Sequence, residues 1–114
     1  MTPDNFHERR RFPRVKSAVA LELRHSGSTA PVRATTTEIS IGGCYIETMF
    51  TLDIGTKLDM VLWIDDKKVS AKGVIATRYP QVGNGIDIVD MKPEQRATLE
   101  KFLEAQQVQT PKRF

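Results

Sequence analysis

Arginines near the start of the chain are the side chains best suited to chemistry. Arg9, Arg10, Arg11 and Arg14 fall within six residues, and Pro13 interrupts them. A guanidinium group presents a planar fork of donors that suits the oxygens of an anion such as phosphate. Solubility alone requires fewer arginines than this, so the cluster favours the binding of an anion.

The whole net charge of +3 lies in this part of the chain. Residues 1–16 contain five basic and two acidic side chains, whereas the rest of the chain contains twelve of each. A protein that binds duplex nucleic acid usually spreads its basic residues over a surface that matches many phosphates. One compact cluster instead favours one small anion or a short acidic contact, and we expect no DNA binding.

A second group of residues with chemical potential begins 24 residues after Arg14. Glu38 offers a carboxylate and Ser40 a hydroxyl, and the pair Gly42-Gly43 lets the main chain approach another molecule closely. Taken alone, this stretch is typical of an ordinary turn at the end of a strand, with glycines for positive φ. Its position after the arginine cluster favours a binding site.

Short segments with a period of two must position these residues. Asp65-Asp66-Lys67 predicts a hairpin turn, and Gly83-Asn84-Gly85 predicts a second turn. About six strands at spacings of eight to fifteen residues indicate a small antiparallel barrel or sandwich. The predicted strands lie at about residues 19–24, 35–39, 44–48, 57–64, 69–75 and 86–88.

The pattern becomes helical near the end of the chain. Pro93 suits the first turn of a helix, and apolar residues then recur at helical spacing as Leu99, Phe102 and Leu103. We predict a helix from about residue 93 to 107 that packs this stripe on the barrel. We expect Trp63 to pack under this helix rather than to serve as a ligand platform.

Composition limits the class of protein. The 114 residues fit one domain, with 39% hydrophobic and 27% charged residues, and no apolar run approaches the roughly 20 residues of a membrane span. The charged first 16 residues do not fit a secretory signal, so we expect a cytoplasmic protein without membrane insertion. The sequence shows no zinc, P-loop or nucleophile motif, and we expect no enzyme activity, metal or cofactor. Cys44, the single cysteine, fits a small buried hydrophobe better than a reactive thiol.

Three segments resemble signatures of the PilZ family. Residues 10–14, Arg-Arg-Phe-Pro-Arg, match its RxxxR signature. Residues 38–43 are similar to a second signature, which has Asp or Asn, then Ser two residues later, then Gly three beyond. Residues 83–88 are similar to a third, softer pattern, a Gly-x-Gly turn that leads into a strand. The resemblance covers roughly residues 8–104.

The resemblance implies a fold and a division of the chain. The fold is mainly β, a small six-stranded antiparallel PilZ-type barrel with one C-terminal α-helix. Residues 1–7 and 108–114 would be flexible tails around a domain at 8–107. Within that domain the arm would span 8–14, the barrel about 15–89 and the helix about 93–107.

The resemblance also implies a receptor for cyclic diguanylate (cyclic di-GMP). Arg10 and Arg14 would be the main clamps, and Arg9 would favour an intercalated pair of ligands. Glu38 would accept from the N1–H and N2–H₂ donors of guanine, and Ser40 would bind the ligand backbone or base. The implied ligand-binding residues are Arg9, Arg10, Arg14, Glu38, Ser40, Gly42 and Gly43.

Glu38 departs from the family pattern, because members usually have Asp or Asn at this position. The longer side chain would bind with altered geometry and lower affinity, or would form an ion pair with an arginine of the arm. We therefore keep two hypotheses. The first is a cyclic di-GMP receptor, monomeric or dimeric through its ligand, that orders its arm and signals to an unidentified downstream protein. The second is an adaptor that binds only protein and has lost the nucleotide.

Overall fold

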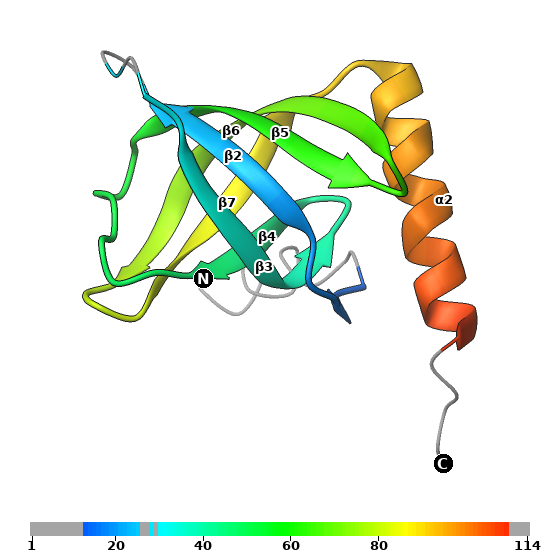
Figure 1. Ribbon diagram of the computed structural model, residues 1–114, viewed down its shortest axis with the longest axis horizontal. Helices are drawn as coiled ribbons and strands as arrows, with labels where there is room; N and C mark the ends of the chain where they lie inside the picture. The colour runs from blue at the N-terminus through cyan, green and yellow to red at the C-terminus, as the bar shows by residue number, and fades with distance from the viewer. Residues whose placement is uncertain (1–12, 26–27, 29, 110–114) are drawn as a thin grey trace, which may run out of the picture.

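The structure is a computed structural model that describes residues 13–25, 28 and 30–109. Within these ranges the chain forms seven strands and a C-terminal helix (Figure 1). The elements are β1 (Val15–Lys16), β2 (Ala20–His25), β3 (Val32–Ser40), β4 (Gly43–Glu47), β5 (Lys57–Ile64), β6 (Lys67–Tyr79), β7 (Gly83–Asp90) and α2 (Pro93–Gln109).

Six of the strands close into an antiparallel barrel. Their order is β2-β5-β6-β7-β4-β3, and β3 completes the circle because it pairs with both β4 and β2. The two-residue β1 pairs with the far end of β3, where Val15 lies opposite Ile39 and Lys16 opposite Glu38. The predicted six-stranded antiparallel barrel with one C-terminal helix is therefore confirmed, with β1 as a short addition.

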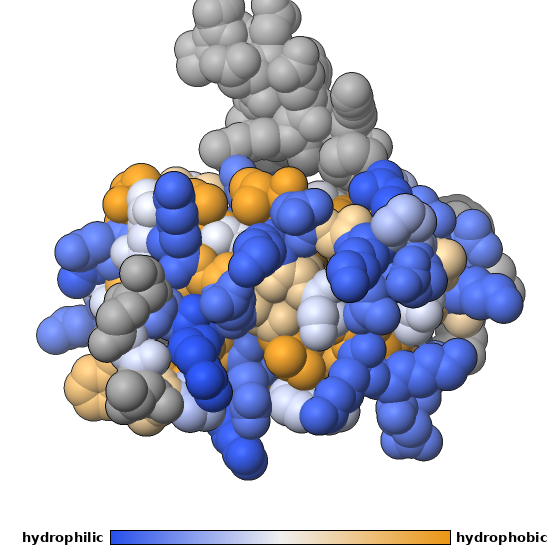
Figure 2. All heavy atoms as spheres, turned by 90° about the horizontal axis from the view of Figure 1, so that it is seen from above, coloured by the Kyte–Doolittle hydropathy of each residue, from blue (hydrophilic) through white to orange (hydrophobic). Residues whose placement is uncertain are grey.

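Alternating apolar side chains fill the barrel. Leu21 and Leu23 of β2 lie beside Leu62 and Met60 of the paired strand β5, and all four point into the interior and are almost completely buried. Burying a side chain of this size stabilises the fold by about 1.5–3 kcal/mol. On the face shown in Figure 2, hydrophilic residues predominate, and apolar residues appear between them in small groups. The periodicity of two in the sequence thus separates the inner from the outer side chains.

Helix α2 covers one side of the barrel. Leu99, Phe102 and Leu103 are buried in the common core, as the helical spacing predicts. The helix lies against β6, β5 and β1 (Figure 1). Because β1 follows Arg14 directly, the helix supports the strand that positions this arginine. No helix in the described ranges has both the length and the apolar character that crossing a membrane requires.

One of the two predicted turns is confirmed and the other is wrong. Asp65 and Asp66 form a two-residue hairpin loop with φ of 50° and 70°, the left-handed conformation of the tight turns that match strand twist. Residues 83–85, predicted as a turn, are instead the first residues of β7. The turn lies just before them, at residues 80–82, where Gln81 has φ of 65°.

The glycines of this segment serve close packing rather than a turn. A Cβ on Gly83 would collide with the Ile46 carbonyl and the Tyr45 ring, and a Cβ on Gly85 would collide with the Thr77 hydroxyl. Gly-Asn-Gly is also a common turn sequence, so local composition could not distinguish the two roles.

Trp63 lies on the outer surface of β5, beside β2 and β3. It lines a shallow groove of about 420 Å³ together with residues of those two strands. The neighbours that form this groove are Ala20, Leu21, Arg33, Ala34 and Thr35. The expected position under α2 is thus replaced by a position over the β2–β3 pair.

Replacing Leu99 with alanine tests the support that α2 gives to the barrel. Leu99 is 0% exposed, so Leu99→Ala should lower the free energy of unfolding by about 2–4 kcal/mol, as buried truncations do. Urea unfolding followed by circular dichroism measures the change. Lys101→Ala, on the exposed side of the same helix, should change it by no more than about 0.5 kcal/mol. Equal effects of the two substitutions would show that the helix does not support the barrel through Leu99.

Candidate functional site

A β-bulge turns Glu38 and Ser40 toward the outside of the barrel. Pairing of β3 with β4 shifts register between Thr36 and Glu38, so Thr37 is an extra residue in β3. Before the bulge Thr36 is buried, and after it Ile39 is buried. The inward positions therefore change from even to odd numbers, and the even-numbered residues that follow point outward.

A second bulge does the same in β6. Val69, Ala71 and Ile75 are buried at odd positions, as the sequence predicts. The register with β7 then shifts between Ile75 and Thr77, with one extra residue in β6. The shift brings Thr77 to the same side as the outward-facing Gly85, whose N–H donates to the Thr77 hydroxyl at 3.1 Å. The two bulges thus bring outward side chains of β3 and β6 to one region of the surface.

A pocket of about 630 Å³ occupies this region, on the outer surface of β3, β4, β6 and β7. Its volume lies within the range of small-molecule sites, roughly 300–1,000 Å³. Five of the sequence-predicted ligand residues line it, namely Arg14, Glu38, Ser40, Gly42 and Gly43. The other two, Arg9 and Arg10, lie outside the described residues.

Arg14 and Glu38 meet at the edge of the pocket. Arg14 Nη1 donates to Glu38 Oε1 at 3.4 Å, and the two side chains are 53% and 36% exposed. The antiparallel pairing of β1 with β3 explains the contact, because it places the residue before Val15 beside the end of β3. An ion pair this exposed contributes at most about 1 kcal/mol, so an incoming anion can displace the carboxylate.

Ser40 holds the turn between β3 and β4. Its hydroxyl accepts from the Gly42 N–H at 3.1 Å and donates to the Gly43 carbonyl at 3.4 Å. Gly43 lies against β7, where a Cβ would collide with the Ile86 carbonyl. Neither glycine has a positive φ, in contrast to the ordinary turn considered from the sequence. Ser40 and Gly43 therefore each have a structural role in addition to any contact with a ligand.

Sequence reasoning missed four polar or aromatic residues of the pocket. Tyr45 of β4, Thr77 and Tyr79 of β6, and Asp87 of β7 also line it. The two tyrosine rings lie 6.3 Å apart between centroids and are tilted by 54°. Asp87 and Tyr45 could have been found from the alternation of β4 and β7, but Thr77 and Tyr79 face outward only because of the bulge.

The phenol of Tyr45 stays protonated at neutral pH. Partial burial raises its pKa above the usual value, and the neighbouring Tyr79 and Glu47 raise it further. The hydroxyl is therefore available as a hydrogen-bond donor to a ligand.

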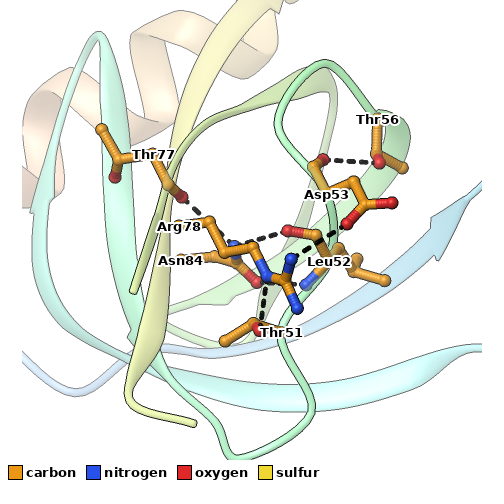
Figure 3. A network of polar contacts seen from close by, with 7 residues as sticks. All are labelled: Thr51, Leu52, Asp53, Thr56, Thr77, Arg78 and Asn84. Carbon is orange, nitrogen blue, oxygen red and sulfur yellow. Dashed lines mark hydrogen bonds and ion pairs between the residues drawn. The ribbon is translucent and has the colours of Figure 1, made fainter. Parts of the chain in front are cut away.

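A buried asparagine joins the loop of residues 48–56 to β6 at Thr77, which lines the pocket (Figure 3). Asn84 is 0% exposed; its Nδ2 donates to the carbonyls of Leu52 and Thr77 at 3.0 and 3.2 Å, and its Oδ1 accepts from the Leu52 N–H at 2.8 Å. Arg78 adds contacts to the Thr51 hydroxyl at 2.9 Å and to the Asp53 carboxylate at 3.2 Å. The loop of residues 48–56 is thereby held against β6 and β7, beside Thr77.

Cys44 is a buried free thiol, as the sequence indicates. Burial raises its pKa to about 12, so it is a poor nucleophile although it lies behind the pocket. Within the described ranges, no three His, Cys, Asp or Glu residues gather in a group that could hold a metal ion.

Comparisons with known proteins agree with this fold. The family model of the PilZ domain matches residues 8–105. Similar solved structures include the Bacillus subtilis inhibitor of motility MotI/DgrA, with a TM-score of 0.77 and 11% identity over 90% of this chain. Another is the PilZ domain of CeSA from a cellulose-synthesizing bacterium, with a TM-score of 0.65 and 13% identity over 81% of this chain.

The lengths of these neighbours differ. This chain spans about half of MotI/DgrA, 53% of that chain, and 95% of the CeSA domain. At such low identities the likeness shows the fold alone. A search of the curated proteins found no match.

Truncating Asn84 should loosen the wall of the pocket. Asn84→Ala leaves the Leu52 N–H and two carbonyls without their partner, so the free energy of unfolding should fall by about 2–4 kcal/mol. Thr51→Ala removes only an exposed bond to Arg78 and should cost less than about 1 kcal/mol. Urea unfolding of both variants measures the difference. A cost for Asn84→Ala as small as that for Thr51→Ala would contradict the assigned role.

The thiol of Cys44 should make stability fall in alkaline solution. Its pKa rises from 9.0 to about 12 on folding, so the unfolded chain loses the proton first. The stability that the neutral thiol provides is complete below about pH 9 and is lost as the pH rises toward 12, with about 1 kcal/mol lost by pH 10. Urea unfolding at pH 7 and pH 10 measures this loss of unfolding free energy, and Cys44→Ala gives the contribution of all other titrating groups. An identical pH dependence in both proteins would refute it.

Proposed function

Since the chain belongs to the PilZ family, we propose that it binds cyclic di-GMP in the pocket on β3, β4, β6 and β7 and transmits this binding to a protein partner. PilZ domains are generally receptors for this nucleotide, and they also interact with partner proteins. The proposed activity is binding rather than catalysis. The proposed location of the protein and its ligand is the cytoplasm.

One observation supports the proposal most strongly. Arg14 and Glu38 belong to two signatures that are 24 residues apart in the chain, yet they are in contact at the edge of one pocket. Ser40 and Gly43 of the second signature line the same pocket. The meeting of Arg14 with the second signature at one pocket is therefore better explained by a binding site than by a charged tail without a function.

The charge balance of the pocket explains why the ligand would need the arm. The charged residues among those that line the pocket are Arg14, Glu38 and Asp87, one cation against two carboxylates. A cyclic dinucleotide brings two negative phosphates, which two carboxylates repel. Arg9 and Arg10 would supply the missing positive charge as charge-assisted, two-pronged donors to phosphate.

Ordering of the arm would convert binding into a signal. Fixing the backbone costs roughly 1–2 kcal/mol per residue, which the arginine–phosphate bonds must exceed. The arm would then take one position only when the ligand is present, and a partner that contacts this position would distinguish the two states. One ligand per monomer and an intercalated pair that joins two chains are both compatible with this scheme.

A second candidate is a protein-binding adaptor without a nucleotide. Its support is the Arg14–Glu38 ion pair itself, in which each group already satisfies the other. In addition, the loop of residues 48–56 exposes Met49, Phe50 and Ile54, a kind of surface that suits a protein contact. The similar fold of MotI/DgrA, described as an inhibitor of motility, is in keeping with a protein partner.

Calorimetric titration with cyclic di-GMP tests the receptor. We expect saturable binding that falls at least about 100-fold in Arg14→Ala, because charge-assisted hydrogen bonds to phosphate are lost. Arg96→Ala removes an arginine of similar exposure from an ion pair on α2 and should bind like the unchanged protein. Wild-type affinity in a folded Arg14→Ala variant would contradict the proposed site.

Substitution at position 38 separates the two candidates. Glu38→Asp restores the usual family residue and shortens the side chain by one methylene, which should weaken its contact with Arg14 and raise nucleotide affinity. If neither this variant nor the unchanged protein gives binding heat at high concentrations of both components, the adaptor replaces the receptor as the preferred function.

A further inference from the structure

The outer surface of β4 and β7, beside Arg14, has few side chains because glycines occupy several of its outward positions. Each outward pair across these two strands has one glycine, namely Gly43 opposite Asp87, Tyr45 opposite Gly85, and Glu47 opposite Gly83. Strand pairs of this kind leave a shallow trough, because only one side chain of each pair rises above the backbone. Asp87 and Tyr45 stand diagonally across the trough, which places them roughly 7–8 Å apart at the backbone.

The aromatic wall of this trough suits a flat ring. Tyr45 is half-buried along the glycines of β7, and Tyr79, whose centroid is 6.3 Å away, is 54% exposed. Both rings line the pocket, so a base that enters it would meet aromatic surface. Stacking on an aromatic side chain is worth about 1–3 kcal/mol per base but does not distinguish one base from another.

Asp87 supplies the chemistry that distinguishes bases. Its side chain is exposed, and within the described ranges its carboxylate has no hydrogen-bond or ion-pair partner. Glu38, the other carboxylate of the pocket, is held by Arg14 at 3.4 Å. A carboxylate can accept two parallel bonds, and guanine offers adjacent N1–H and N2–H₂ donors on one edge, whereas adenine presents an acceptor at N1.

We propose that Tyr45, Tyr79 and Asp87 form a guanine subsite, in which the tyrosines stack on the base and Asp87 accepts from its N1–H and N2–H₂ groups. The proposal rests on cyclic di-GMP as the ligand and identifies how this chain selects guanine. Asp87 thereby takes a role that the resemblance implied for Glu38, whose carboxylate is already in contact with Arg14 at 3.4 Å.

Paired titrations with cyclic di-GMP and cyclic di-IMP, which lacks the N2 amine, test the subsite. The unchanged protein should bind cyclic di-GMP on the order of 10-fold more tightly than cyclic di-IMP, because one accepted bond is lost with the amine. Asp87→Ala should lower the affinity for cyclic di-GMP and bring the ratio of the two affinities close to one. Asp59→Ala removes an exposed carboxylate from the outer surface of β5, outside the pocket lining, and should keep both the affinity and the ratio.

Substitution of the tyrosines should affect both ligands equally. Tyr79→Ala and Tyr45→Leu should each lower the affinity for both dinucleotides by about 10-fold. The ratio of the two affinities should stay unchanged, because stacking does not depend on the N2 amine. Thermal unfolding confirms that each variant is folded; leucine is used at position 45 because it keeps an apolar cover over Gly83 and Gly85.

The outcomes separate this proposal from the one it rests on. If the unchanged protein binds neither dinucleotide, both fail. Suppose instead that the unchanged protein binds cyclic di-GMP, that Arg14→Ala abolishes this binding, and that Asp87→Ala keeps the preference for cyclic di-GMP over cyclic di-IMP. The receptor function then stands and the guanine subsite is overturned.

Discussion

The close pairing of β4 with β7 is the constraint on which both the barrel and its site depend. The two strands approach so closely that Gly43 has no room for a Cβ against the Ile86 carbonyl, and Gly83 has none against the Ile46 carbonyl and the Tyr45 ring. A side chain at either position would force the strands apart and open the barrel. The same missing side chains leave the outer surface bare, so the packing requirement and the binding surface arise from one set of residues.

Much of the fold could be predicted from the sequence because its information is local and periodic. The alternation of Leu58, Met60, Leu62 and Ile64 requires only that one side of a strand be buried, and the structure buries all four. The Asp65-Asp66 turn was equally predictable, because few sequences tolerate two successive left-handed residues. The strand at residues 83–85 was not predictable in this way, because its glycines are required by close contacts with Tyr45 and Thr77, which are not their neighbours in the sequence.

The candidate site was predictable only in part, and the bulges explain the limit. Arg14, Glu38, Ser40, Gly42 and Gly43 came from signature spacing, and the structure brings them together. Thr77 and Tyr79 continue the odd-numbered series of buried residues in β6, so periodicity alone assigns them to the core. One inserted residue reverses that assignment. A bulge depends on the register between two strands, which no single strand specifies, so its effect becomes visible only in the folded barrel.

Rigid and exchangeable contacts are divided between the two sides of the pocket. On the side of β6 and β7, Asn84 is fully buried with its amide satisfied, so this wall is fixed before any ligand arrives. On the side of β3, Arg14 and Glu38 form an exposed pair that is worth little and can be exchanged for a better partner. A preformed wall keeps the ordering cost of binding low, whereas the exposed Arg14 can exchange Glu38 for a bound anion. The proposed receptor function would use both properties, the fixed wall to hold the ligand and the exchangeable contact to respond to it.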